Sequence, residues 1–76
     1  MGQNIINDKL KEADEIYELG LKNIDEKQYT NAKDNLYKAA MLKLEIASYI
    51  KGLEKAHLLK EVKRIFSKIN LLDAKS

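Results

Sequence analysis

The stretch DEKQYTNAKDNLYKAA, residues 25–40, joins two predicted helices without a glycine or a proline. Its polar start suits a turn, and it then places Tyr29, Ala32, Leu36 and Ala39 at steps of three, four and three residues. These steps bring the four side chains onto one face of an α-helix. Because alanine is small, the same face allows a neighbouring helix to approach closely. The stretch therefore predicts a tight turn followed by a helix that packs on the one before it.

The polar residues around this turn offer candidate caps for the second helix. Asp and Thr side chains accept hydrogen bonds from the free backbone N–H groups of a first helical turn. Asp25 or Thr30 is the predicted cap. Asn4 or Asn7 is the corresponding prediction for the start of the first helix.

Apolar residues keep a helical spacing on both sides of the turn. The upstream stripe consists of Ile6, Leu10, Ala13, Tyr17, Gly20 and Ile24. A second helix is predicted over residues 30–50 and is apolar nearly all round in its second half, as in a helix with neighbours on two sides. A third is predicted over residues 53–72, and its stripe consists of Leu58, Val62, Ile65, Ile69 and Leu72. The chain has no proline, and short connections make consecutive helices antiparallel. The predicted fold class is all-α, an antiparallel up-down-up three-helix bundle.

Two glycines have specific places in this pattern. Gly20 lies inside the first stripe, where glycine costs about 1 kcal/mol relative to alanine, so we expect a neighbouring helix to approach closely there. Gly52 follows the second helix, where a left-handed C-cap commonly falls.

Composition and charge limit the class of protein. The chain has 76 residues, of which 45% are hydrophobic and 34% charged, which indicates one small folded domain. We expect residues 1–4 to be disordered or added for expression, residues 5–73 to form the bundle, and residues 74–76 to begin a linker. Residues 51–76 hold seven Lys and Arg against three acids, a net charge of +4. This basic third is either a solvated helix face or a surface that attracts an acidic partner.

The sequence lacks the usual catalytic and metal-binding patterns. His57 is the only histidine and there is no cysteine, so a metal site of nitrogen and sulfur ligands is not expected. No glycine-rich phosphate loop and no nucleophile signature is present. We therefore predict a binding domain without a cofactor of its own and not an enzyme. With 14 basic residues against 12 acids, nucleic-acid binding is not expected either.

The spacing of Tyr29, Ala32, Leu36 and Ala39 resembles two helical families, the tetratricopeptide repeat and the microtubule interacting and trafficking (MIT) domain. Here no proline ends the second helix, the helices are longer than about 14 residues, and no repeat follows. The chain therefore resembles the MIT domain more closely, over residues 5–73.

Three departures from the MIT pattern accompany this resemblance. Ile24 stands where the family often has an aspartate, and Lys27 and Gln28 replace its usual Gly-Asn. Asn70 replaces a glutamate near the end of the third helix. The change at Asn70 removes an expected partner for an arginine on a bound peptide.

The resemblance implies a protein-interaction module. MIT domains bind short C-terminal motifs of ESCRT-III filament subunits and are often attached to an AAA ATPase that remodels those filaments in membrane trafficking, protein transport or cell division. ATP and Mg²⁺ are expected only if such a separate ATPase domain follows. The implied location is cytoplasmic, with recruitment to membranes through the filament partners. The domain itself is expected to be monomeric and to make no direct membrane insertion.

The resemblance also implies two grooves for the peptide. Between the second and third helices, the candidate residues are Phe66, Met41, Ile46, Tyr49, Leu59 and Val62. Between the first and third helices, they are Tyr17, Ile16 and Ile65. Lys63, Arg64 and Lys68 are candidates for pairing with acidic peptide residues at a rim. The other interpretation is that the apolar members only form the core.

Two further functions remain open from the sequence. A tetratricopeptide-like helical adaptor would need additional repeats in the full-length protein. A helical oligomerisation module would use the largely apolar second helix as its interface.

Overall fold

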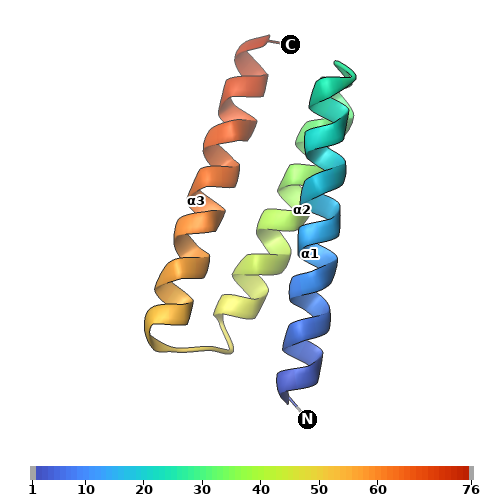
Figure 1. Cartoon of the computed structure of the whole chain (residues 1–76). Coiled ribbons are helices and arrows are strands. Elements are labelled where there is room, and N and C mark those ends of the chain that lie inside the picture. Colours follow the sequence, from blue (N-terminus) through green and yellow to red (C-terminus); the bar gives the residue numbers. More distant parts are fainter. Residues whose placement is uncertain (1, 76) are drawn as a thin grey trace.

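The computed structural model describes residues 2–75 as three α-helices, with no strand in that range. Helix α1 spans Gly2–Asp25, α2 spans Tyr29–Ala47 and α3 spans Gly52–Lys75. Consecutive helices run in opposite directions (Figure 1). The prediction of an all-α three-helix bundle is confirmed.

Helical structure extends into both predicted terminal segments. Helix α1 begins at Gly2, within the predicted disordered start, and α3 ends at Lys75, within the predicted linker. Met1 and Ser76, which complete those two segments, lie outside the described residues.

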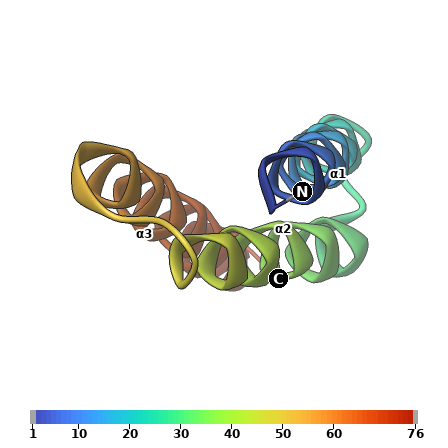
Figure 2. The ribbon, with the colours of Figure 1, turned by 90° about the horizontal axis from the view of Figure 1, so that it is seen from below.

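Helix α2 lies between the other two and packs against both of them. Among residues 2–75, no Cα atom of α1 comes within 8 Å of a Cα atom of α3. The end-on view shows α1 and α3 standing apart on the same side of α2 (Figure 2). The bundle is therefore open along one side.

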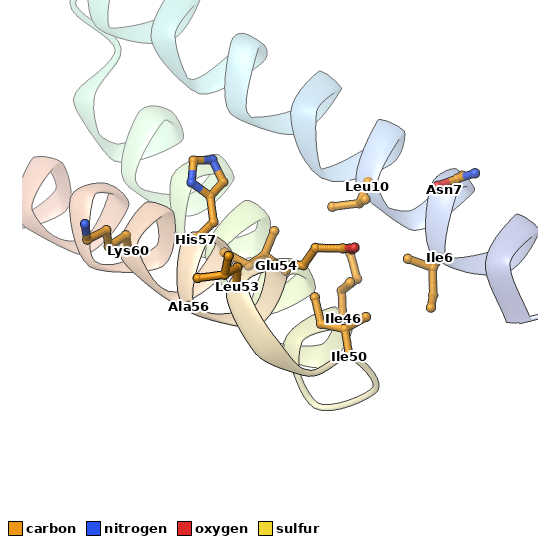
Figure 3. Close-up of a pocket in the computed structure, with 11 residues that line it drawn as sticks. Ile6, Asn7, Leu10, Ile46, Ile50, Leu53, Glu54, Ala56, His57 and Lys60 are labelled. Atoms are coloured by element: carbon orange, nitrogen blue, oxygen red, sulfur yellow. The ribbon is translucent and has the colours of Figure 1, made fainter.

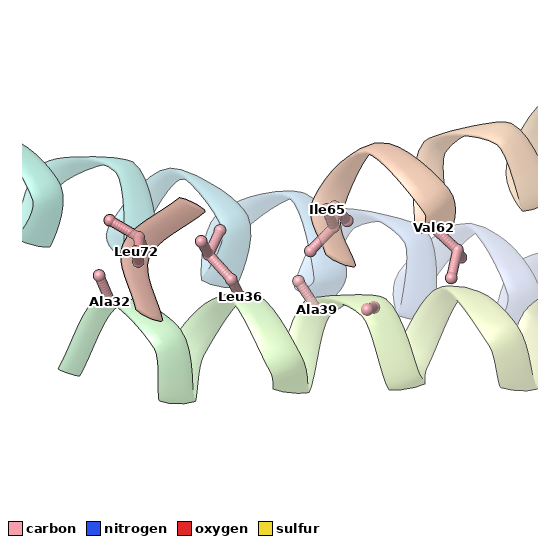
Figure 4. Packing of buried hydrophobic residues seen from close by; sticks show 7 residues of the cluster. Ala32, Leu36, Ala39, Val62, Ile65 and Leu72 are labelled. Atoms are coloured by element: carbon pink, nitrogen blue, oxygen red, sulfur yellow. The ribbon is translucent and has the colours of Figure 1, made fainter. Parts of the chain in front are cut away.

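The largest core cluster lies where both outer helices meet α2. Its buried members are Ala32, Leu36, Ala39, Ala40, Val62, Ile65 and Leu72 (Figure 4). The predicted packing face of α2 is confirmed, because its alanines and Leu36 are all fully buried. A second, smaller cluster forms near the other end of α2 and consists of Ile46, Ala47 and Leu58.

Gly20 allows α1 to pack closely on α2. A Cβ atom built on Gly20 would lie 2.9 Å from Cδ2 and 3.1 Å from Cγ of Leu36. The predicted close approach at this glycine is confirmed.

The turn between α1 and α2 ends the first helix without a glycine. The N–H of Gln28 donates to the carbonyl of Asn23 at 2.8 Å, and the N–H of Lys27 donates to the carbonyl of Ile24 at 2.9 Å. These two bonds form a Schellman motif, in which the residue after the helix adopts a left-handed conformation. Here that residue is Lys27, with φ of 61°.

The predicted caps are wrong. Gln28 is the N-cap residue of α2 and makes no side-chain capping hydrogen bond. Asp25 is the last residue of α1, Thr30 already lies inside α2, and Asn4 and Asn7 follow the start of α1 at Gly2. The Schellman motif ends at Gln28, and α2 begins at the next residue. The N-cap position therefore falls on Gln28, which is neither an acid nor a hydroxyl residue.

An amide network joins the two helices at this turn instead. The Asn35 side-chain amide donates to Oδ1 of Asn23 at 2.7 Å, and the Asn23 amide donates to Oε1 of Gln28 at 3.3 Å. Asn23 is buried, with 7% of its surface exposed. Buried polar groups need such partners, so the network satisfies Asn23 and fixes the end of α1 on α2.

The predicted role of Gly52 is only half right. Its φ of 75° is left-handed as expected, but Gly52 is the first residue of α3 and does not cap α2. Helix α2 ends at Ala47, three residues before the predicted end at Ile50. The Ser48 hydroxyl donates to the carbonyl of Glu45 at 2.6 Å, a local bond that competes with continued helix.

Replacing Lys27 with glycine is expected to raise the free energy of unfolding by about 0.5–1 kcal/mol. The left-handed conformation costs a residue with a Cβ atom about 1–2 kcal/mol, and the greater freedom of glycine in the unfolded chain offsets part of that gain. Urea denaturation followed by circular dichroism measures the change. Glu26→Gly, at the neighbouring position without positive φ, is the control and should destabilise. Equal destabilisation by both variants would contradict the left-handed turn at Lys27.

Candidate functional site

The open side of the bundle forms a groove with α2 as its floor. Two pockets define this α1–α3 groove. The first, of about 610 Å³, is shown in Figure 3 and is lined by Ile6, Asn7, Leu10, Ile46, Ile50, Leu53, Glu54, Ala56, His57, Leu58 and Lys60. The second, of about 280 Å³, is lined by Asp14, Tyr17, Lys43, Glu61, Arg64 and Ile65.

The first pocket is mainly apolar. Ile46 rises from α2 between the start of α3 and the Ile6 and Leu10 side chains of α1 (Figure 3). Ile6, Leu10 and Ile50 pack around the smaller core cluster and remain partly exposed. Leu53 is 90% exposed at the edge of the pocket. Apolar side chains left open to water in a concave site favour binding of an apolar partner surface.

The second pocket is organised around Lys43. This residue lies on α2 and is only 6% exposed. Its Nζ atom is 2.8 Å from Oε1 of Glu61 on α3 and 3.4 Å from Oδ1 of Asp14 on α1. The same atom lies 5.9 Å from the ring centroid of Tyr17, within reach of a cation–π interaction. One buried ammonium group therefore links all three helices across the open side.

The surroundings of Lys43 favour its charged form. Burial of the ammonium by itself lowers the pKa of Lys43. The hydrogen bond and charge of Glu61, and then the charge and hydrogen bond of Asp14, outweigh this effect and raise the pKa above its ordinary value of 10.5. Lys43 is therefore cationic at neutral pH, and its charge is matched by carboxylates on both walls of the groove.

The sequence predictions missed this cluster. The sequence did contain one signal for it, a lysine on the predicted packing face of the second helix. Lys43 follows Leu36 by seven residues and Ala39 by four. Such spacing keeps all three on one side of the helix. A charged residue at that register indicates either an exposed position or a buried ion pair, and sequence spacing alone does not distinguish the two.

The structure brings only some of the predicted binding residues together. Tyr17, Arg64 and Ile65 line the second pocket, around Lys43, and Ile46 forms the floor of the first, apolar pocket. Ile16, predicted for the same groove, instead lines a pocket of about 500 Å³ between α1 and α2.

The residues predicted for a groove between α2 and α3 do not converge. Met41 lines the same α1–α2 pocket as Ile16, and Tyr49 lines a pocket with residues of α1. Val62 is buried core, with 5% exposed. Phe66 is half-buried and packs edge-on against Tyr37, with ring centroids 6.1 Å apart.

The remaining predicted residues lie along α3. Leu59 and Lys63 are exposed, and Lys68 is half-buried. Of these three, none lines either pocket of the α1–α3 groove.

Within residues 2–75, no three histidine or acidic side chains are grouped as a metal site would require. None of the three described helices combines the length and the apolar character needed to cross a bilayer. Comparison with known proteins gave no matching family, no matching curated protein and no matching solved structure.

Proposed function

We propose that this chain is a peptide-binding helical module of the MIT type, and that the α1–α3 groove is its binding site. The observation that carries the proposal is the separation of α1 from α3, which leaves an apolar pocket of about 610 Å³ between them. The packing of Ala32, Leu36 and Ala39 in the core also supports it, because these residues carry the resemblance to the MIT domain.

An amphipathic helix is the form of peptide that this groove fits best. Both walls are helices packed on a common floor, so a further helix would complete a four-helix arrangement. The groove runs from Ile6 to Tyr17 along α1, about 16 Å at about 1.5 Å per residue, which corresponds to three helical turns. Apolar anchors at one end and polar partners at the other would set the affinity and the register.

The two halves of the groove favour different peptide residues. Leucine or isoleucine side chains would fill the apolar pocket beside Leu10 and Leu53. Farther along, a basic peptide residue could pair with Asp14, whose side chain is 69% exposed, and an acidic one with the exposed Arg64. We expect a dissociation constant of about micromolar or weaker, as for many short helical peptides.

The proposed partners are the C-terminal motifs of ESCRT-III-type filament subunits. Binding them would recruit an attached AAA ATPase in the cytoplasm for filament remodelling in membrane trafficking or cell division. In this function the domain binds and does not catalyse, and it needs no cofactor.

A helical oligomerisation module is the second candidate. The high exposure of Leu53 favours it, because a second copy could also cover the apolar pocket. Sedimentation velocity separates the two functions, since the peptide-binding module should sediment as a monomer of 8.7 kDa. A stable dimer at micromolar concentration would favour the oligomerisation module.

The variant Ala56→Trp is expected to weaken peptide binding at least about tenfold, or about 1.4 kcal/mol. Ala56 is exposed and lines the apolar pocket, so a bulky ring there competes with the peptide for space. Fluorescence anisotropy of a labelled ESCRT-III peptide measures the affinity. Ala74→Trp, at an exposed alanine near the end of α3, is the matched control and should bind normally. Unchanged binding by Ala56→Trp would contradict the proposed groove.

A further inference from the structure

Apolar and basic side chains gather at one end of the bundle. The start of α1 and the loop between α2 and α3 lie at this same end (Figure 1). The described residues that form it, called the basic tip here, are Ile5, Tyr49, Lys51, Leu53 and Lys55.

The apolar members of the basic tip are unusually exposed. Leu53 is 90% exposed, Tyr49 67% and Ile5 56%. Ile5 and Tyr49 line a pocket of about 390 Å³ together with Ile6 and Lys9, so the start of α1 and the loop after α2 form one continuous surface. These side chains contribute little to the core and remain available to a partner.

The charges of the basic tip are available as well. Lys51 and Lys55 are exposed, and no ion pair joins either of them to another described residue. Glu54 is the only acid in residues 48–60, a segment that also contains Lys60. A partner with negative charge would therefore find lysines on both sides of Leu53 in the sequence.

The shape of the tip favours a lipid surface over a folded protein. The bundle measures 40 × 19 × 13 Å, so its end is small compared with the roughly 800 Å² that each partner buries in a standard protein interface. A bilayer needs no matching surface, because apolar side chains enter the headgroup boundary while lysines remain at the anionic surface. Tyrosine is also enriched at that boundary.

We propose that the basic tip docks on anionic lipid bilayers, with Leu53 and Tyr49 at the headgroup boundary and Lys51 and Lys55 against the lipid phosphates. This is a peripheral contact, and it departs from the expectation that the domain makes no direct membrane insertion. It does not depend on peptide binding in the α1–α3 groove, since no peptide is needed for the contact. Leu53 also lines the apolar pocket of the groove, so, if both functions hold, a peptide in the groove and the bilayer would meet at this residue.

Cosedimentation with vesicles tests the proposal using the chain alone. Vesicles of phosphatidylcholine with phosphatidylserine should bind the chain about 25-fold more tightly than vesicles of phosphatidylcholine only, because each of two lysines near an anionic surface contributes about fivefold. The variant with Lys51→Gln and Lys55→Gln should lose this difference. The pair Lys22→Gln and Lys75→Gln, at exposed lysines outside the tip, should keep it.

The apolar contact is tested in the same assay. Leu53→Ser should weaken binding to the phosphatidylserine vesicles by at least about tenfold, because it removes three carbon atoms, each worth up to about 0.8 kcal/mol when buried in the bilayer. Leu71→Ser, at a leucine of α3 that is 66% exposed, should have no effect. Absence of binding to these vesicles would overturn the proposal. A second result would also overturn it: Leu53→Ser binds the vesicles normally and polyglutamate fully displaces the chain from them. That result would show that the tip binds acidic molecules in general and not a bilayer.

Discussion

Replacing Leu36 with alanine is expected to lower the free energy of unfolding by about 3 kcal/mol, within the usual 2–5 kcal/mol for a buried leucine. Leu36 is fully buried between the helices, and a chain of 76 residues has a total stability of only about 4–11 kcal/mol. Urea denaturation followed by circular dichroism measures the loss. Leu71→Ala, at an exposed leucine, should change stability by less than about 0.5 kcal/mol.

A double-mutant cycle between Gly20 and Leu36 tests whether these two residues pack directly on each other. In the original chain, Gly20→Ala gains helix propensity worth about 1 kcal/mol but places its Cβ atom 2.9 Å from Leu36 Cδ2, and overpacking costs about 1–3 kcal/mol. In the Leu36→Ala background the clash is gone, so Gly20→Ala should stabilise. We expect a coupling of at least about 1 kcal/mol. Additive effects would contradict the close packing of α1 on α2 at this point.

Replacing Lys43 with glutamate is expected to lower the free energy of unfolding by about 3 kcal/mol or more. The new carboxylate would be buried where Asp14 and Glu61 already converge, and breaking a buried ion pair typically costs about 3–5 kcal/mol. Lys43→Met is the control, because it removes the charge and keeps much of the volume. Asp14 and Glu61 remain partly exposed, at 69% and 33% of their side chains, so water can solvate them. The control should lose less than about 1.5 kcal/mol.

The pH dependence of the same variants supplies a second measurement. A group whose pKa is raised on folding contributes stability below its unfolded pKa and loses that contribution as pH rises through the folded value. The pKa of Lys43 is raised above its ordinary value of 10.5, so we expect the unsubstituted chain to lose stability relative to Lys43→Met as the pH rises above about 10.5. Identical alkaline profiles for the two proteins would contradict the ion-pair cluster around Lys43.

The helices themselves could be predicted because their apolar spacing is regular. Leu36 and the alanines on its face predicted the buried side of α2, and Gly20 predicted a close approach, since a glycine within a helix has a cost that tight packing offsets. The turn was less predictable. Lys27 carries a left-handed conformation that glycine usually provides, so its residue type gave no signal for the Schellman motif.

The surroundings of the candidate binding residues were predicted only in part. Residue type shows which side chains are apolar and spacing shows which of them share a helix face, but neither shows which neighbour covers them. Val62 and Leu59 were therefore both predicted to line a groove, although Val62 is buried in the core and Leu59 is exposed. The separation of α1 from α3 depends on the crossing of both helices over α2, which no local pattern specifies. Tyr17 was correctly placed on the side of α1 that faces the open groove, whereas Met41 and Tyr49 lie toward α1 and not toward α3.

An NMR titration of isotope-labelled protein tests the proposed groove most directly. The ligands would be C-terminal peptides of ESCRT-III subunits from the organism that encodes the chain. Binding in the α1–α3 groove predicts chemical-shift changes that cluster on Leu10, Tyr17 and Leu58 and that saturate between about micromolar and millimolar peptide. Changes confined to Leu59 and Phe66, or no changes at millimolar peptide, would contradict the proposal.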